Sequence, residues 1–170
     1  MEETFGQEVI SMSKLKEFIG YPTINPIVFY SGKFAGYITW AVLLISLRRF
    51  RFDSETGFNE YGALLLMVAG LLISLVSLVN LGKSTRFGLP ITMTVLKTKG
   101  LYRFSRNPVY VGFNLLTLAA MLYTLNLLIN LMGLYSIIVY HFIILAEERF
   151  LARRFRKDYD EYRQKIRRYL

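Results

Sequence analysis

The chain has no cysteine and only one histidine, His141, in 170 residues. The lack of cysteine excludes disulfide bonds, thiolate zinc sites, cysteine nucleophiles and prenylation of the chain itself. A single histidine excludes a metal site built from several histidines, and no loop rich in carboxylates offers an alternative. We therefore expect no bound metal.

Charge is missing from long stretches of the chain. Residues 27–47, 61–81 and 109–146 together contain one Lys, Arg, Asp or Glu, which is Lys33. The charged residues collect in blocks between these stretches, whereas a soluble domain mixes charge throughout. This segregation and a mean hydropathy of +0.36 are typical of an integral membrane protein.

The charge that is present is mostly positive, with a formal net charge of +9. Basic residues flank the apolar stretches, so membrane anchoring explains most of them, and we expect membrane lipids rather than nucleic acid as partners. The acidic start, Met-Glu-Glu, does not have the basic region and apolar core of a signal peptide. The sequence leaves the oligomeric state open.

The hydropathy pattern predicts an all-α integral membrane protein with about four transmembrane helices. We expect an amphipathic or loose segment over residues 1–26 and two transmembrane helices within residues 27–81. Gly32 and Gly36 in the first span form a GxxxG pattern, which permits close contact with another helix. Residues 82–170 form a third unit, in which we expect the chemistry.

The uncharged run 109–146 is too long for one span and short for two. It predicts a helical hairpin with a short, tilted or partly sunken first arm near 108–123, a turn around 124–127 and a second arm near 128–148. Beyond the hairpin, apolar and aromatic residues recur at helical spacing and predict a cytosolic amphipathic helix that continues the last span. These residues are Leu151, Phe155, Tyr159, Tyr162 and Ile166.

The distribution of Lys and Arg predicts the orientation. The connector 82–107 contains six and the tail 149–170 contains nine, against three in the linker 48–60 and none in the turn 124–127. The positive-inside bias therefore places both termini and the connector in the cytosol. Because we find no targeting signal, we expect a prokaryotic plasma membrane.

One polar motif lies where the connector meets the hairpin, in the stretch LKTKGLYRFSRNPVYVG (residues 96–112). Gly100 permits a backbone conformation that other residues resist. Arg106-Asn107-Pro108 ends an extended segment and starts a helix, for which Asn107 is a candidate N-cap. The motif is either a well-capped helix start or part of a functional site.

A second polar motif, Glu147-Glu148, closes the apolar run. Two adjacent carboxylates at a membrane border either remain in water at a helix end or bind partners such as the ribose or amine of a ligand. The seven-residue spacing places Tyr140 above Glu147 and His141 above Glu148, so that each pair shares one helix face. His141 is then either a packing residue or a group that orients or protonates a substrate.

Together, these motifs resemble the isoprenylcysteine carboxyl methyltransferase family and the related phospholipid methyltransferases. The shared pattern is Arg-His/Asn-Pro-x-Tyr-x-Gly, here Arg106 to Gly112, then an apolar hairpin and a Glu-Glu pair followed by Leu, Phe and two Tyr. The resemblance covers about residues 94–168. It implies a membrane enzyme that uses S-adenosylmethionine without a Rossmann domain.

The resemblance also implies roles for individual residues. One set lines the cofactor, and it comprises Thr94, Val95, Leu96, Lys97 and Tyr102 on the methionine side, Asn107, Pro108, Val109 and Tyr110 as a wall, and Glu147 on a polar group. As catalytic residues we expect Arg106 to steady an anionic acceptor or the cofactor carboxylate, and Glu148 or His141 to face a lipophilic acceptor that enters from the bilayer.

The chain departs from the family pattern at three positions. Asn107 replaces the more familiar histidine, and Arg156 replaces a glycine, which predicts a straighter start of the tail helix. Ile143 stands where the carboxyl methyltransferases have a substrate-binding arginine. We expect a prenylcysteine-type carboxylate or a similar group as acceptor; the alternatives are a lipid amine or small thiol, or a membrane scaffold or transporter subunit without enzymatic activity.

Overall fold

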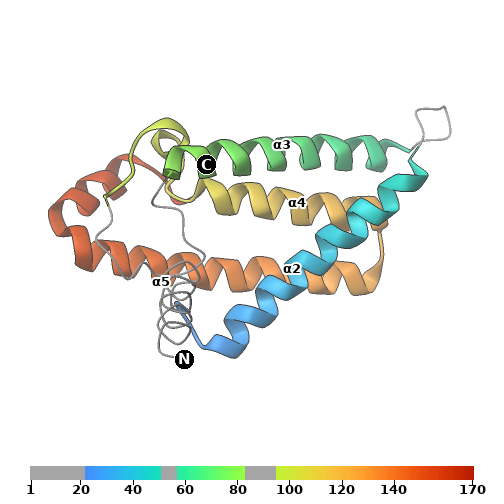
Figure 1. Ribbon diagram of the computed structural model, residues 1–170, viewed down its shortest axis with the longest axis horizontal. Helices are drawn as coiled ribbons and strands as arrows, with labels where there is room; N and C mark the ends of the chain where they lie inside the picture. Colours follow the sequence, from blue (N-terminus) through green and yellow to red (C-terminus); the bar gives the residue numbers. More distant parts are fainter. Residues whose placement is uncertain (1–21, 51–56, 83–94) are drawn as a thin grey trace, which may run out of the picture.

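The computed structural model describes residues 22–50, 57–82 and 95–170, and in these residues all regular structure is helical (Figure 1). The long helices are α2 (Pro26–Ser46), α3 (Phe58–Leu81), α4 (Pro108–Thr124) and α5 (Leu127–Lys165), and two short 3-10 helices are η1 (Leu47–Arg49) and η3 (Gly100–Arg103). The predicted all-α class is confirmed. Most of the predicted N-terminal segment 1–26, and also Thr94, lie outside the described residues.

Three of the helices, α2, α3 and α5, are long and apolar enough to cross a membrane. The fourth, α4, is apolar but has only 17 residues, as expected for the short arm of the hairpin. The turn between α4 and α5 falls at Leu125 and Asn126, where the sequence predicts it. Leu125 adopts a left-handed conformation, and the Asn126 side chain accepts hydrogen bonds from two backbone N–H groups at the start of α5.

Helices α3 and α4 lie antiparallel and side by side (Figure 1). They approach each other closely at Gly70 and Gly112, where a Cβ atom on Gly70 would lie 2.8 Å from the Gly112 carbonyl oxygen. Such backbone proximity is available only where side chains are absent or small. The start of α4, which carries the first polar motif, is therefore held against α3.

Helix α2 crosses the other helices obliquely and packs on α5 through its two glycines (Figure 1). A Cβ on Gly32 would overlap the Val139 side chain, and one on Gly36 would lie 2.6 Å from the Ser136 hydroxyl. The predicted close contact of the GxxxG pattern is thereby confirmed. The contact brings the first turns of α2, including Lys33, to the part of α5 that precedes Glu147.

Helix α5 does not continue straight into its tail. At Arg156 the backbone has φ 43° and ψ −114°, a conformation that favours glycine, and beyond it the chain turns back toward η3 (Figure 1). The predicted straighter helix is therefore wrong, because Arg156 adopts the kinked conformation without glycine. The tail's aromatic residues pack against the connector, since Tyr159 and Tyr162 are buried and the Tyr162 hydroxyl donates to the Tyr102 carbonyl at 2.6 Å.

Candidate active site

The two polar motifs meet at one end of the α4–α5 hairpin. Asn107 Nδ2 donates to Glu148 Oε1 at 3.0 Å, and the Tyr110 hydroxyl donates to Glu147 Oε1 at 2.7 Å. Residues about forty positions apart in sequence are thus joined because the hairpin brings the start of α4 beside the middle of α5. The resemblance assigns residues of both motifs to one cofactor site, and the structure brings these motifs into contact.

The local structure of Asn107 explains which group it contacts. Pro108 begins α4 and Asn107 occupies the N-cap position, but its side chain makes no capping hydrogen bond. It donates instead to Glu148 and, at 3.3 Å, to the Arg168 carbonyl. The predicted N-cap position is confirmed, whereas the expected capping hydrogen bond is absent, because the side chain is oriented so that its Nδ2 group donates to the buried Glu148 carboxylate, which requires donors.

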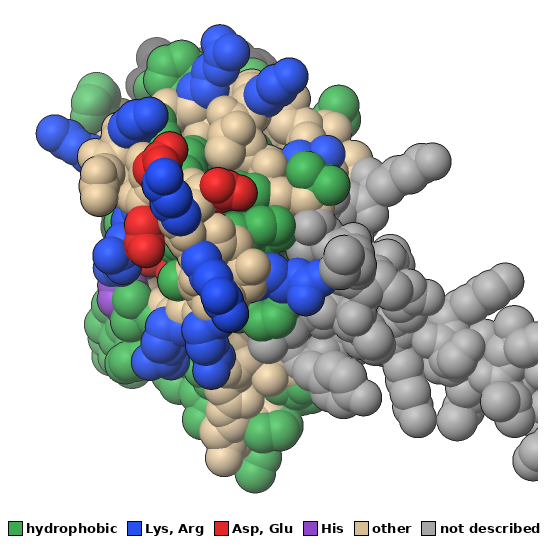
Figure 2. Space-filling view, turned by 90° about the vertical axis from the view of Figure 1, so that its left-hand side faces the viewer, with side chains coloured by type: hydrophobic (Ala, Val, Ile, Leu, Met, Phe, Trp, Pro, Cys, Tyr) green, Lys and Arg blue, Asp and Glu red, His purple; other side chains and the backbone are tan. Residues whose placement is uncertain are grey.

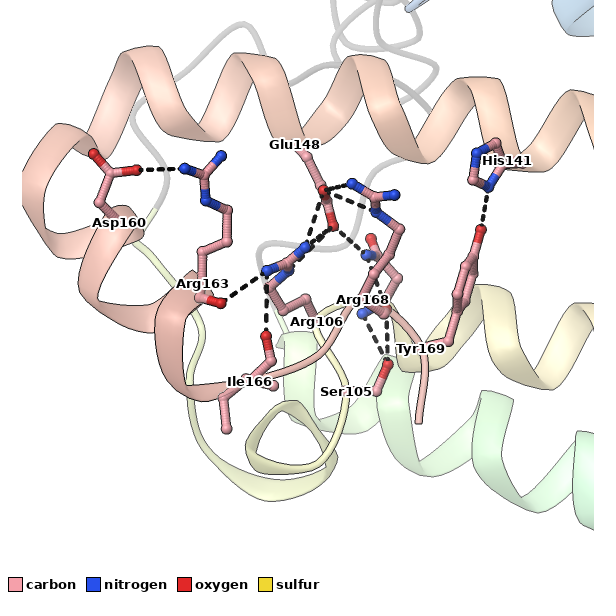
Figure 3. Close-up of polar contacts among 10 residues, drawn as sticks. Ser105, Arg106, His141, Glu148, Asp160, Arg163, Ile166, Arg168 and Tyr169 are labelled. Carbon is pink, nitrogen blue, oxygen red and sulfur yellow. Dashed lines mark hydrogen bonds and ion pairs between the residues drawn. The ribbon is translucent and has the colours of Figure 1, made fainter.

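Glu148 is the centre of a buried cluster of charges (Figure 3). Arg106 donates to it from Nε at 3.1 Å and from Nη2 at 3.0 Å, and Arg168 donates from Nε at 3.1 Å. The side chains of Arg106 and Glu148 are 8% and 9% exposed, whereas that of Arg168 is 35% exposed. A single carboxylate thus faces two guanidinium groups.

The remaining donor of Arg106 is also occupied. Its Nη1 donates to the carbonyls of Arg163 at 3.1 Å and Ile166 at 3.2 Å (Figure 3). In this structure, Arg106 and Glu148 therefore hold the connector, α5 and the end of the chain together. Their expected contact with a substrate stays a prediction.

Glu147 has a different environment from its neighbour. Within the described part of the chain, Glu147 accepts one hydrogen bond, at Oε1, whereas Glu148 accepts five. Glu147 is half-buried, and Lys33 of α2 interacts with it electrostatically. A half-buried carboxylate with an oxygen to spare is suited to accept hydrogen bonds from a ligand.

Aromatic rings surround the Tyr110 side chain that contacts Glu147. The Tyr110 ring centroid lies 5.6 Å from that of Tyr140 and 6.2 Å from that of Phe113, so α4 and α5 are packed tightly at this level. Tyr102 of η3 is buried, and burial, followed by the nearby Tyr162 and Glu147, raises the pKa of its phenol. A phenol with a raised pKa stays protonated at neutral pH and remains a hydrogen-bond donor.

His141 does not contact Glu148 in the described residues. Its Nδ1 is joined by a hydrogen bond of 2.6 Å to the Tyr169 hydroxyl, and the two rings stack with centroids 6.1 Å apart (Figure 3). The expectation that His141 faces an acceptor stays a prediction. Tyr169 reaches it because the chain folds back after Arg156.

The other expected cofactor residues are near the motifs but differ in exposure. Pro108 is buried, Val109 is half-buried, and both lie in the first turn of α4. Leu96 and Lys97 are half-buried, whereas Val95 is 73% exposed. In the structure, Asn107, Pro108, Tyr110 and Glu147 thus lie close together, and Tyr102 is near enough to Glu147 to interact with it electrostatically. Val95 lies at the surface.

Three residues of this region were not selected from the sequence. Arg168 and Tyr169 bind Glu148 and His141, and Ser105 is 1% exposed and accepts a hydrogen bond from the Asn107 backbone N–H at 3.1 Å. No pattern marks Arg168 and Tyr169 because they lie in a tail where basic and aromatic residues are abundant. Ser105 directly precedes the Arg-Asn-Pro motif, and its position next to this motif is the sequence feature that could have identified it.

The long apolar helices define an integral membrane protein, and its buried polar cluster lies where the start of α4 meets the middle of α5. The family model described as phospholipid methyltransferase matches residues 58–158, which is more than half of the chain. The chain belongs to this family, and it is a membrane methyltransferase. Neither a curated protein nor a solved structure matches it. The match includes α3, η3, α4 and α5 up to Asp158 and leaves α2 and the final residues outside.

Proposed function

We propose that the protein transfers a methyl group from S-adenosylmethionine to an acceptor carried by a membrane lipid. The observation that carries this proposal is the half-buried Glu147, which keeps acceptor capacity while it is oriented by Tyr110. The ribose hydroxyls and the amine of the cofactor are donors of the kind that such a carboxylate accepts. The residues present therefore fit this cofactor.

The cofactor supplies a methyl group that is already activated on a sulfonium. The protein must then mainly align the reactants and exclude water. Glu147 binds a polar group of the cofactor, Tyr110 fixes the orientation of Glu147, and Asn107 with Pro108 forms the adjacent wall. The Arg106–Glu148 pair does not bind the cofactor itself; it supports the site by holding the connector against α5.

For the acceptor, the contacts favour a lipid amine over a prenylcysteine-type carboxylate. Ile143, at the position of the substrate-binding arginine of the carboxyl methyltransferases, is fully buried in an apolar cluster with Phe29 and Val139. The guanidinium groups of Arg106 and Arg168 both bind Glu148. An anionic acceptor would have to compete with Glu148 for these guanidinium groups, whereas a neutral amine needs no cation to bind it. A protonated amine must first lose its proton, and His141 is our candidate for the acceptor of that proton.

We place the site at the cytosolic surface, with both chain termini on that side. Figure 2 looks onto the end of the molecule where α5 bends, and Lys and Arg side chains cover much of that face. A surface of this charge matches the cytosolic side of a membrane. The cofactor then enters from water, and the lipid acceptor enters laterally from the bilayer of a prokaryotic plasma membrane.

The test is methyl transfer by the purified protein in lipid nanodiscs with S-adenosylmethionine labelled in its methyl group. We expect label in an ethanolamine phospholipid, none in a prenylcysteine analogue, and loss of transfer in Glu147→Gln. The matched control is Glu161→Gln, the same change at a side chain that is 57% exposed. Label in the prenylcysteine analogue alone would overturn the amine assignment, and equal transfer by Glu147→Gln would overturn the role of Glu147.

A further inference from the structure

The last five residues, 166–170, form a segment that we call the strap. It follows the end of α5 and lies against the connector in an extended conformation (Figure 3). Four hydrogen bonds link its backbone to the Ser105-Arg106-Asn107 segment, and one of them is the bond from Arg106 Nη1 to the Ile166 carbonyl. The Arg167 carbonyl accepts from the Arg106 N–H at 2.9 Å, and the Arg168 carbonyl accepts from Ser105 Oγ at 3.2 Å and from Asn107 Nδ2 at 3.3 Å.

The strap's side chains reach two residues of α5 that the sequence assigns to catalysis. Arg168 binds Glu148, and Tyr169 binds and stacks on His141. The cluster does not need Arg168 for charge neutrality, because Arg106 already balances the charge of Glu148. A second guanidinium in a buried cluster adds desolvation without adding a counter-ion, so charge balance does not explain its presence.

Exposure indicates what Arg168 does. Its side chain is 35% exposed, whereas those of Arg106 and Glu148 are almost buried. Its ion pair is therefore the contact of the cluster that water reaches most easily, and the one that opens at least cost. Release of the strap would uncover Ser105 and Asn107, which lie beneath its backbone.

We propose that Arg168 and Tyr169 are positioning residues, which close the cofactor site by holding the strap over the connector. This inference rests on the proposed function. While the strap is closed, Arg168 fixes Glu148 and, through it, Asn107, and Tyr169 fixes the ring of His141. Opening of the strap loosens the wall that contacts the cofactor and lowers the affinity for it. The strap lies outside residues 58–158, the part of the chain that the family model matches.

The first test reads closure directly and needs no activity. The chain has no cysteine, so a Ser105→Cys substitution introduces a single thiol at a position that is 1% exposed. We measure its reaction with a water-soluble maleimide in the protein in nanodiscs. Adding Arg168→Gln should accelerate labelling about fivefold, the size that loss of one partly exposed ion pair supports. Arg167→Gln, the same change at an exposed neighbour, should leave the rate unchanged.

The second test separates positioning from a general loss of structure. In Arg168→Gln we expect the KM for S-adenosylmethionine and the Kd for S-adenosylhomocysteine to rise about fivefold, with kcat changed less than about twofold. Arg168→Lys should restore part of the affinity, and Tyr169→Phe should raise the KM without the unfolding that a core defect produces.

The outcomes are distinct. Equal labelling rates in the Arg168→Gln and Arg167→Gln backgrounds, or equal S-adenosylhomocysteine affinity in the two, would overturn the inference. If the parent protein binds no S-adenosylhomocysteine, the proposed function fails, and the assignment of the strap to a cofactor site fails with it. Faster labelling in Arg168→Gln would then show only that the strap covers Ser105.

Discussion

Replacing Glu148 by glutamine should destabilise the protein strongly, because it leaves two guanidinium groups without a counter-ion. Arg106 is the more costly of the two, since its side chain is 8% exposed and its Nε and Nη2 both donate to the carboxylate. Breaking a buried ion pair by removing one partner costs about 3–5 kcal/mol. At about 2–4 °C per kcal/mol for a chain of this size, the midpoint of thermal unfolding should fall by roughly 10 °C.

The assay is thermal unfolding in detergent, followed by the fluorescence of Trp40. The chain has one tryptophan, and its ring lies 5.1 Å from that of Phe113 and its indole N–H donates to Thr117, so its emission reports the packing of α2 on α4. The matched control is Asp160→Asn, which removes a carboxylate from an ion pair whose side chains are more than half exposed. The control should change stability by less than about 1 kcal/mol.

A double-mutant cycle tests the physical reason. If the cost of Glu148→Gln comes from the unpaired Arg106, then adding Arg106→Gln should recover part of the loss, with a coupling energy of about 2 kcal/mol. Additive effects of the two substitutions, or a loss below about 1 kcal/mol for Glu148→Gln alone, would refute the reasoning. The second result would mean that water already solvates the cluster.

Three further substitutions test the backbone geometry, each by the same unfolding assay. Arg156→Gly should stabilise the protein by about 1 kcal/mol, because glycine adopts positive φ without the strain that a side chain causes, and an unchanged midpoint would argue against strain there. Gly100→Ala should destabilise by about 1–2 kcal/mol or more, because φ is 65° and a Cβ would overlap Asn80; full stability would contradict that close approach. Gly36→Leu should cost about 1–3 kcal/mol, because the side chain would collide with Ser136, and tolerance of leucine would mean that α2 and α5 are further apart.

Much of the helical architecture could be predicted from the sequence. Uncharged runs of the right length predict the spans. The helix-breaking or polar residues in the middle of the run 109–146 mark a hairpin, whose turn the structure places at Leu125 and Asn126; they are Thr124, Asn126, Asn130 and Gly133. The hairpin then requires the motifs at its two ends to meet, as they do through Tyr110 and Glu147. The division of the chain into three units stays a prediction.

The details of the polar cluster could not be predicted, because they depend on contacts distant in sequence. The kink at Arg156 has no local signal, since the residue that usually permits positive φ is absent. Without the kink, nothing brings Arg168 and Tyr169 back to α5. The sequence alone therefore predicts a capping hydrogen bond for the Asn107 side chain. In the structure, this side chain instead donates to the buried Glu148.

The account depends most on the claim that the two motifs together bind a nucleoside methyl donor, and a calorimetric titration of the purified protein with S-adenosylhomocysteine tests it most directly. We predict saturable binding with a Kd in the micromolar range, about −8 kcal/mol. We further predict that Glu147→Gln abolishes this binding, whereas Glu161→Gln keeps it. No heat of binding in a well-folded sample, or equal binding by Glu147→Gln, would contradict the claim.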